Sequence, residues 1–281
     1  MGKSVEVEFD SQVPVRLASA ARSFAEVHEH LTAWCSDHTS RAAVRISPHD
    51  GSVLEVVTQR PSDALPFEWS TKFGHAVHDL RSGLDHLVQQ LCRLEGQQPT
   101  DPRKVQFPIA DTGEQWRNAR RCLRPMPTSL LSRIEGLQPC RASGDLVDGL
   151  VLLNQLAVRD KHYELTPLMV LPIEPALDNI EPWPVELVDE VDWEAADVKL
   201  HISLAASGDV RGLKGILPIG YTPILIVKGK MAPLLDVMPW LHAVTHAVVD
   251  TVTVGSSSRL RPPAPVWAAF PLDGAAASIE A

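Results

Sequence analysis

The stretch FEWSTKFGHAVHDLRSGLDHLVQQLCRL, residues 67–94, decides how the rest of the chain can fold. At about 100° per residue, its apolar side chains fall on one stripe: Phe73, Val77, Leu80, Leu84, Leu87, Val88 and Leu91. A solvated helix face is usually made of long charged residues, but the opposite face here is short and rich in imidazole: His75, His78, Asp79, Ser82, Asp85, His86 and Gln89. The pattern predicts an amphipathic helix whose polar face meets another part of the protein or a ligand.

Length and composition indicate a globular protein with a sizeable core, because 44% of the 281 residues are hydrophobic. No apolar run reaches the roughly 18–20 residues of a membrane span, and the N-terminus lacks the apolar core of a signal peptide. The cysteines are widely spaced, which favours free thiols in a reducing cytosol: Cys35, Cys92, Cys122 and Cys140. We therefore expect a cytoplasmic protein with no membrane partner, no metal and no cofactor.

Charge is distributed unevenly along the chain, although a net charge of −9 argues against a general nucleic-acid coat protein. Eight Lys and Arg residues lie between positions 103 and 141, against three acids. Nine acids, with no Lys or Arg, lie between positions 174 and 197. The basic segment could bind phosphate, or it could face the acidic segment within the fold.

The remaining pattern predicts the α+β fold class, a bundle of about four to six helices with an attached antiparallel sheet. Apolar periodicity predicts further helices at residues 13–36, 113–124, 128–137, 145–163 and 231–254. Thr128 is expected to cap the helix at 128–137. Residues 40–59 read as a β-hairpin that turns at Asp50-Gly51, and we expect the later strands to join the sheet of this hairpin.

We expect these elements to form a single domain, residues 1–254. It would contain a helical core at about 67–164, strands at about 41–59 and 165–229, and a last helix at 231–254. The tail, residues 255–281, is rich in Ser, Pro and Ala and is expected to be poorly ordered.

Four motifs occur in order between residues 67 and 165: Leu80–Leu87 (LRSGLDHL), Phe107–Ile109 (FPI), Leu137–Pro139 (LQP) and Asn154–His162 (NQLAVRDKH). Together they resemble the signatures of a large, mostly uncharacterised group of bacterial proteins. That resemblance implies no activity.

The sequence Arg81-Ser-Gly-Leu-Asp-His86 also resembles the Arg-x4-His motif of HEPN-domain ribonucleases. The resemblance implies metal-independent RNA cleavage at a site that often forms across a homodimer. His86 would be the acid or base, Arg81 would hold the phosphate and Asp85 would orient one of them. These residue types suit the chemistry, because imidazole titrates near neutrality and guanidinium pairs with phosphate oxygens. Ser82 departs from the family, which usually has Asn, Asp or His there, and on a continuous helix positions five apart lie about 140° apart.

The same residues also permit a structural interpretation. Arg81 and Asp85 are spaced i,i+4 and can form a helix salt bridge. Asp79, Asp85 and His86 would then form a buried polar network with the second long helix, through Asn154, Asp160, Lys161 and His162. A third reading places a metal between His75, Asp79, His86 and His162, although the sequence has no His-Glu-x-x-His motif.

Overall fold

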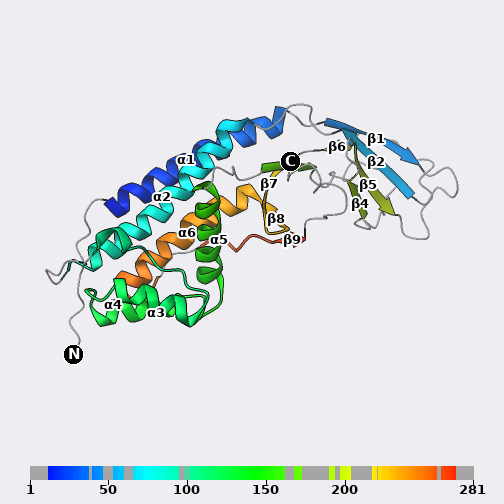
Figure 1. The fold of residues 1–281 in the computed structure, drawn as a ribbon. Coiled ribbons are helices and arrows are strands. Elements are labelled where there is room, and N and C mark those ends of the chain that lie inside the picture. Colours follow the sequence, from blue (N-terminus) through cyan, green and yellow to red (C-terminus); the bar gives the residue numbers. More distant parts are fainter. Residues whose placement is uncertain are drawn as a thin grey trace. The chain divides into compact units, whose positions relative to one another are not determined.

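The computed structural model describes residues 12–37, 40–46, 53–59, 66–94, 99, 101–161, 168–172, 190–193, 197–203, 217–219, 221–257 and 261–269. These residues form two compact units (Figure 1). The first unit holds the described residues within 1–28, 66–167 and 235–266, and the second holds those within 29–65, 168–234 and 267–281. That residues 1–254 fold as one domain stays a prediction.

The described part of the chain contains six α-helices and one short 3₁₀ helix, in agreement with the predicted bundle. They are α1 (Gln12–Asp37), α2 (Phe67–Leu91), η1 (Pro102–Lys104), α3 (Gly113–Cys122), α4 (Thr128–Gly136), α5 (Asp145–Lys161) and α6 (Leu234–Thr253). All seven apolar residues of the predicted α2 stripe are buried. The opening prediction of an amphipathic helix is therefore confirmed.

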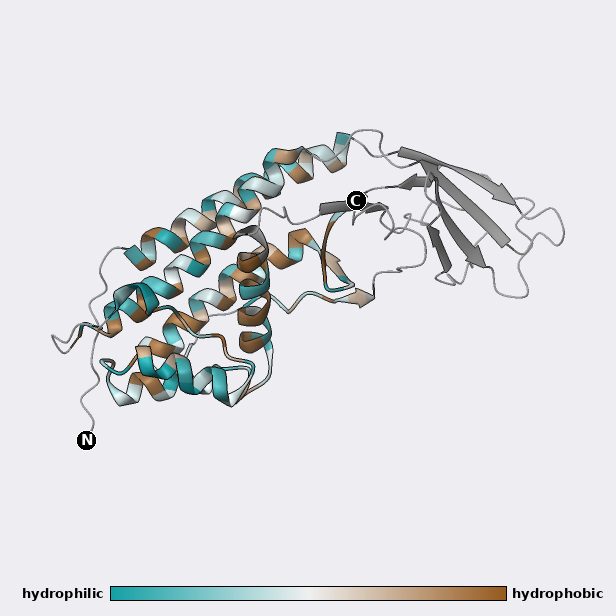
Figure 2. Cartoon of the chain, viewed as in Figure 1, coloured by the Kyte–Doolittle hydropathy of each residue, from teal (hydrophilic) through white to brown (hydrophobic). Residues whose placement is uncertain are grey.

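Helices of the first unit approach one another closely at small residues. A Cβ at Gly83 of α2 would lie 3.4 Å from the Leu17 side chain of α1. The rings of Phe24 on α1 and Phe73 on α2 are tilted by 36°, with their centroids 5.8 Å apart. A Cβ at Gly149 of α5 would lie only 2.6 Å from Val244 of α6. α2 and α5 also pack directly against each other. The buried stripe of α2 is thus covered by its neighbours, as its hydropathy pattern requires (Figure 2).

The second unit contains two antiparallel sheets. One has the strand order β4-β5-β2-β1-β6, from β1 (Ser40–Ile46), β2 (Val53–Gln59), β4 (Glu190–Trp193), β5 (Asp197–Ser203) and β6 (Leu217–Ile219). The other has the order β3-β7-β8-β9, from β3 (Leu168–Pro172), β7 (Tyr221–Val227), β8 (Lys230–Pro233) and β9 (Ala268–Ala269). The predicted hairpin is confirmed by the pairing of β1 with β2, while its turn at Asp50-Gly51 lies outside the described residues.

The expectation that all later strands join the hairpin is wrong for β3, β7 and β8. β5 and β6 do join it, but β7 turns back directly onto β8. The two residues between them, Lys228 and Gly229, both have positive φ, 51° and 71°. Positive φ at both central residues fits the right-handed twist of a tight hairpin, so β7 pairs locally and starts a second sheet.

Two helix ends and part of the tail differ from the sequence predictions. Thr128 is the first residue of α4 and not its cap, because Pro127 occupies the N-cap position. α6 begins at Leu234, since β8 uses the preceding residues, and it contains Pro239. Within the predicted disordered tail, β9 pairs with β8, and residues 258–260 and 270–281 lie outside the described part.

Candidate functional site

Three polar residues of α2 hold the backbone of an extended segment, residues 105–110. Asp85 Oδ1 accepts a hydrogen bond of 2.8 Å from the Phe107 N–H, and Arg81 Nη2 donates one of 2.6 Å to the Phe107 carbonyl. Gln89 Nε2 donates to the Val105 carbonyl at 3.3 Å. The three side chains are four residues apart along α2, a spacing that places them on one face of the helix.

Arg81 and Asp85 also form an ion pair with each other. Arg81 Nη2 lies 3.2 Å from Asp85 Oδ1, and the two side chains are 12% and 24% exposed. Burial lowers the pKa of Arg81, and the Asp85 carboxylate opposes that shift by stabilising the cation. Charged groups at this depth need partners, and Phe107 and the ion pair supply them.

Gln138, in the LQP motif that follows α4, holds the other end of the same segment. Its side chain is fully buried. It accepts a 3.0 Å hydrogen bond from the Ala110 N–H and donates one of 2.9 Å to the Ile134 carbonyl, while the Cys140 N–H donates to the Ala110 carbonyl. We call Arg81, Asp85, Gln89 and Gln138 the backbone clamp. Three of the four sequence motifs therefore meet at residues 105–110.

The other polar residues predicted on α2 point to different partners. Asp79 accepts a 2.7 Å hydrogen bond from Arg16 of α1. His75 is exposed, and His86 is half-buried. Among the residues that the structure describes, His86 has no hydrogen-bond or ion-pair partner. The α2 residues of the predicted site are thus distributed over separate contacts.

The predicted contribution of the second long helix stays a prediction. α5 packs against α2, and Asn154 is half-buried on it. The side chains of Asp160 and Lys161, and all of His162, lie outside the described residues. Asp79 binds Arg16, and Asp85 binds Arg81 and the Phe107 N–H.

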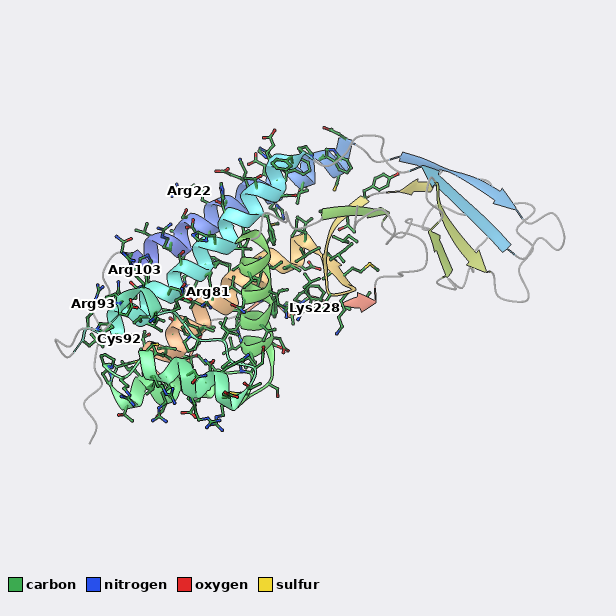
Figure 3. All side chains as sticks on the ribbon, in the orientation of Figure 1. Arg22, Arg81, Cys92, Arg93, Arg103 and Lys228 are labelled. Atoms are coloured by element: carbon green, nitrogen blue, oxygen red, sulfur yellow. The ribbon has the colours of Figure 1, made fainter. Side chains whose placement is uncertain are left out.

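The three hypotheses drawn from the sequence can now be set against this geometry. Arg81, labelled in Figure 3, is held by Phe107 and Asp85. Within the described ranges, no three His, Cys, Asp or Glu side chains lie close enough to hold a metal ion. The i,i+4 salt bridge of the structural interpretation is present between Arg81 and Asp85.

The first unit also contains a hollow between α1 and α6 that sequence reasoning missed. It has a volume of about 340 Å³ and is lined mainly by apolar side chains: Ala21, Phe24, Ala25, His28, Leu235, Met238, Pro239 and His242. The His242 ring nitrogen Nε2 lies 3.3 Å from the Leu17 carbonyl, and the ring meets His246 edge-on. None of the predicted site residues lines this hollow.

Comparisons with protein-family models, with curated proteins and with solved structures found no match. In the part of the chain that the structure describes, no helix is both long enough and apolar enough to cross a membrane. The cysteines of the described chain are free thiols, with Cys92 buried and the others half-buried.

Proposed function

We propose that this chain is a non-catalytic cytoplasmic protein in which the polar face of α2 holds the fold together. One observation carries the proposal: Arg81 and Asp85 bind both the carbonyl and the N–H of Phe107. A catalytic arginine must be free to contact the phosphate of its substrate, whereas Arg81 already has a carbonyl, a carboxylate and little exposed surface. The free cysteine thiols favour a reducing compartment.

The alternative is metal-independent RNA cleavage of the HEPN kind, and one observation favours it. The half-buried imidazole of His86 has no partner among the described residues, and Nη1 of the neighbouring Arg81 is buried without one. An unpaired imidazole suits proton transfer near a phosphate that a guanidinium holds. A second subunit would have to complete such a site, because Arg81 and His86 are about 140° apart on α2.

RNA cleavage assays with a chelator present distinguish the two functions. The wild-type protein, His86→Ala and His75→Ala are compared, the last as a control on an exposed histidine of the same helix. We expect no cleavage by any of them, and a loss of unfolding free energy below about 1 kcal/mol for His86→Ala.

Cleavage that is lost in His86→Ala and kept in His75→Ala would overturn the non-catalytic proposal. Cleavage that all three proteins share equally would indicate a contaminating nuclease. In that case the Arg81→Lys variant, which keeps the charge and loses the fork geometry, is assayed after further purification.

A further inference from the structure

α3 and the turn that follows it carry four exposed arginines, in the middle of the basic part of the sequence. Arg117, Arg120, Arg121 and Arg124 are all exposed, and their spacing of i, i+3, i+4 and i+7 aligns them in one row. We call this row the arginine stripe. The inner face is anchored by Trp116, which is 1% exposed, and by Leu123 just after the helix. In Figure 2, α3 is drawn mostly in the teal of hydrophilic residues.

The positive charge of the arginine stripe is not balanced by nearby acids. Residues 113–124 contain four arginines, no lysine and a single acid, Glu114. Across the described residues, ion pairs form elsewhere in the first unit, and no carboxylate lies within ion-pair distance of a stripe arginine. Within the described part of the chain, one side-chain hydrogen bond involves the stripe, from Arg117 Nε to the Gly113 carbonyl of the same helix.

The stripe stands on a well-fixed helix. The Thr112 side chain accepts from the Gln115 N–H, and the Gln115 side chain accepts from the Thr112 N–H, which completes a capping box. A fixed helix presents its guanidinium groups with less loss of conformational entropy when a ligand binds. Arginine in place of lysine allows bidentate pairing with phosphate oxygens.

We propose that the arginine stripe binds the phosphate backbone of a nucleic-acid duplex. Neighbouring cations of the stripe lie about 5–6 Å apart, and a duplex carries one negative charge for every ~1.7 Å of its axis, so several phosphates lie within reach of the row at once. Single-strand binders stack bases on exposed aromatic side chains, and the one aromatic residue of α3, Trp116, is buried. The contact is to the backbone, so binding is independent of base sequence.

The test measures binding of a fluorescent DNA duplex by anisotropy over a series of salt concentrations. Four phosphate contacts predict a slope of log K against log salt of about −3.6. In the variant with Arg117, Arg120, Arg121 and Arg124 all changed to Gln, we expect affinity to fall at least about tenfold at low salt, with a slope near zero. An RNA duplex of the same length shows which of the two nucleic acids is preferred.

A charge-matched control separates the stripe from the overall charge. Four exposed basic residues elsewhere, labelled in Figure 3, are changed to Gln: Arg22, Arg93, Arg103 and Lys228. This control is expected to keep most of the affinity for the duplex. A variant with lysine at all four stripe positions is expected to keep most of the wild-type slope of log K against log salt. Circular dichroism checks folding. If the quadruple variant fails to fold, the single change Arg124→Gln is used, because Arg124 lies beyond the end of α3. We expect it to make the slope of log K against log salt less negative by about one.

Three outcomes would overturn the proposal. The first is an equal loss of affinity in the stripe variant and the charge-matched control. The second is tighter binding of a single strand of the same sequence than of the duplex. The third is binding of polyglutamate as tight as that of the duplex, which would assign the stripe to an acidic protein segment.

Discussion

The polar face of α2 and the arginine stripe of α3 have similar chemistry and opposite environments. On α2, Arg81 is 12% exposed and bound to Asp85 and to the Phe107 backbone. On α3 and the turn after it, four arginines are exposed without a carboxylate partner among the described residues. A largely buried charge that is bound to its own chain serves the fold, whereas an exposed row of unbalanced charge is available to a partner. The contrast shows that residue type alone does not separate structural from binding residues.

The largest expected effect comes from breaking the backbone clamp on α2. Asp85→Ala removes the acceptor of the Phe107 N–H and leaves the buried Arg81 without its ion-pair partner. We expect a loss of about 3 kcal/mol in the free energy of unfolding, measured by urea denaturation. The double variant Arg81→Leu/Asp85→Leu removes both charges and is expected to recover part of that loss. Stability unchanged in Asp85→Ala would show that the clamp is not structural.

The alkylation rates of Cys92 and Cys122 compare the environments at the ends of α2 and α3 without a mutation. Burial raises the pKa of Cys92, the C-cap residue of α2, from 9.0 to about 11, so at pH 8 its thiolate fraction is about 100-fold below that of an ordinary thiol. We expect alkylation of native Cys92 to be slower than in urea by at least about this factor, and slower than alkylation of the half-buried Cys122 on α3. Mass spectrometry of peptides after timed alkylation measures both rates.

The raised pKa of Cys92 also determines how the folding stability changes with pH. The folded protein keeps the Cys92 proton more tightly than the unfolded chain, so this contribution to stability is complete below about pH 9 and decreases as the pH rises toward 11. A Cys92→Ser variant tests this, since its stability is expected to lose that part of the pH dependence. Equal alkylation rates of Cys92 in the native and unfolded protein would contradict the assignment.

We expect a smaller loss in the free energy of unfolding when Gln138, at the other end of residues 105–110, is changed. Gln138→Ala leaves the buried Ala110 N–H without its acceptor and removes one of the two hydrogen bonds that the Ile134 carbonyl accepts, the other coming from the Leu137 N–H; we expect a loss of about 2 kcal/mol in the free energy of unfolding. Gln106→Ala is the matched control, because Gln106 is exposed in the same segment, and a change below about 0.5 kcal/mol is expected. Similar losses in both variants would mean that the Gln138 hydrogen bonds contribute little.

The smallest effect on stability is expected from the arginine stripe. Changing its four arginines to Gln removes no described ion pair and replaces one good helix former with another. The helix dipole loses two cations of the last turn, Arg120 and Arg121, so we expect a loss of less than about 1 kcal/mol by urea denaturation. A loss comparable to that of Asp85→Ala would show that the stripe is structural as well, and would remove the contrast with α2.

Local patterns in the sequence predicted the helices and the hairpin, and they failed where distant residues meet. The i,i+4 pair of Arg81 and Asp85 is visible in the sequence because both residues lie on one helix. Their hydrogen bonds to Phe107 cannot be predicted from the sequence, because they are made to a backbone N–H and carbonyl, which do not depend on the type of side chain. Gln138 was part of a recognised motif, and only its burial against Ala110 reveals its role. The hollow between α1 and α6 depends on which helices become neighbours.

By itself the sequence determined the α+β fold class, the buried stripe of α2 and the concentration of positive charge between residues 103 and 141. These follow from hydrophobic periodicity and charge, which act over a few residues along the chain. Only the tertiary structure decided that the polar face of α2 is bound to residues 105–107 and that the arginines of α3 face outward. Burial decides between a structural and a binding role for the same side chain, and burial depends on which distant segments pack together.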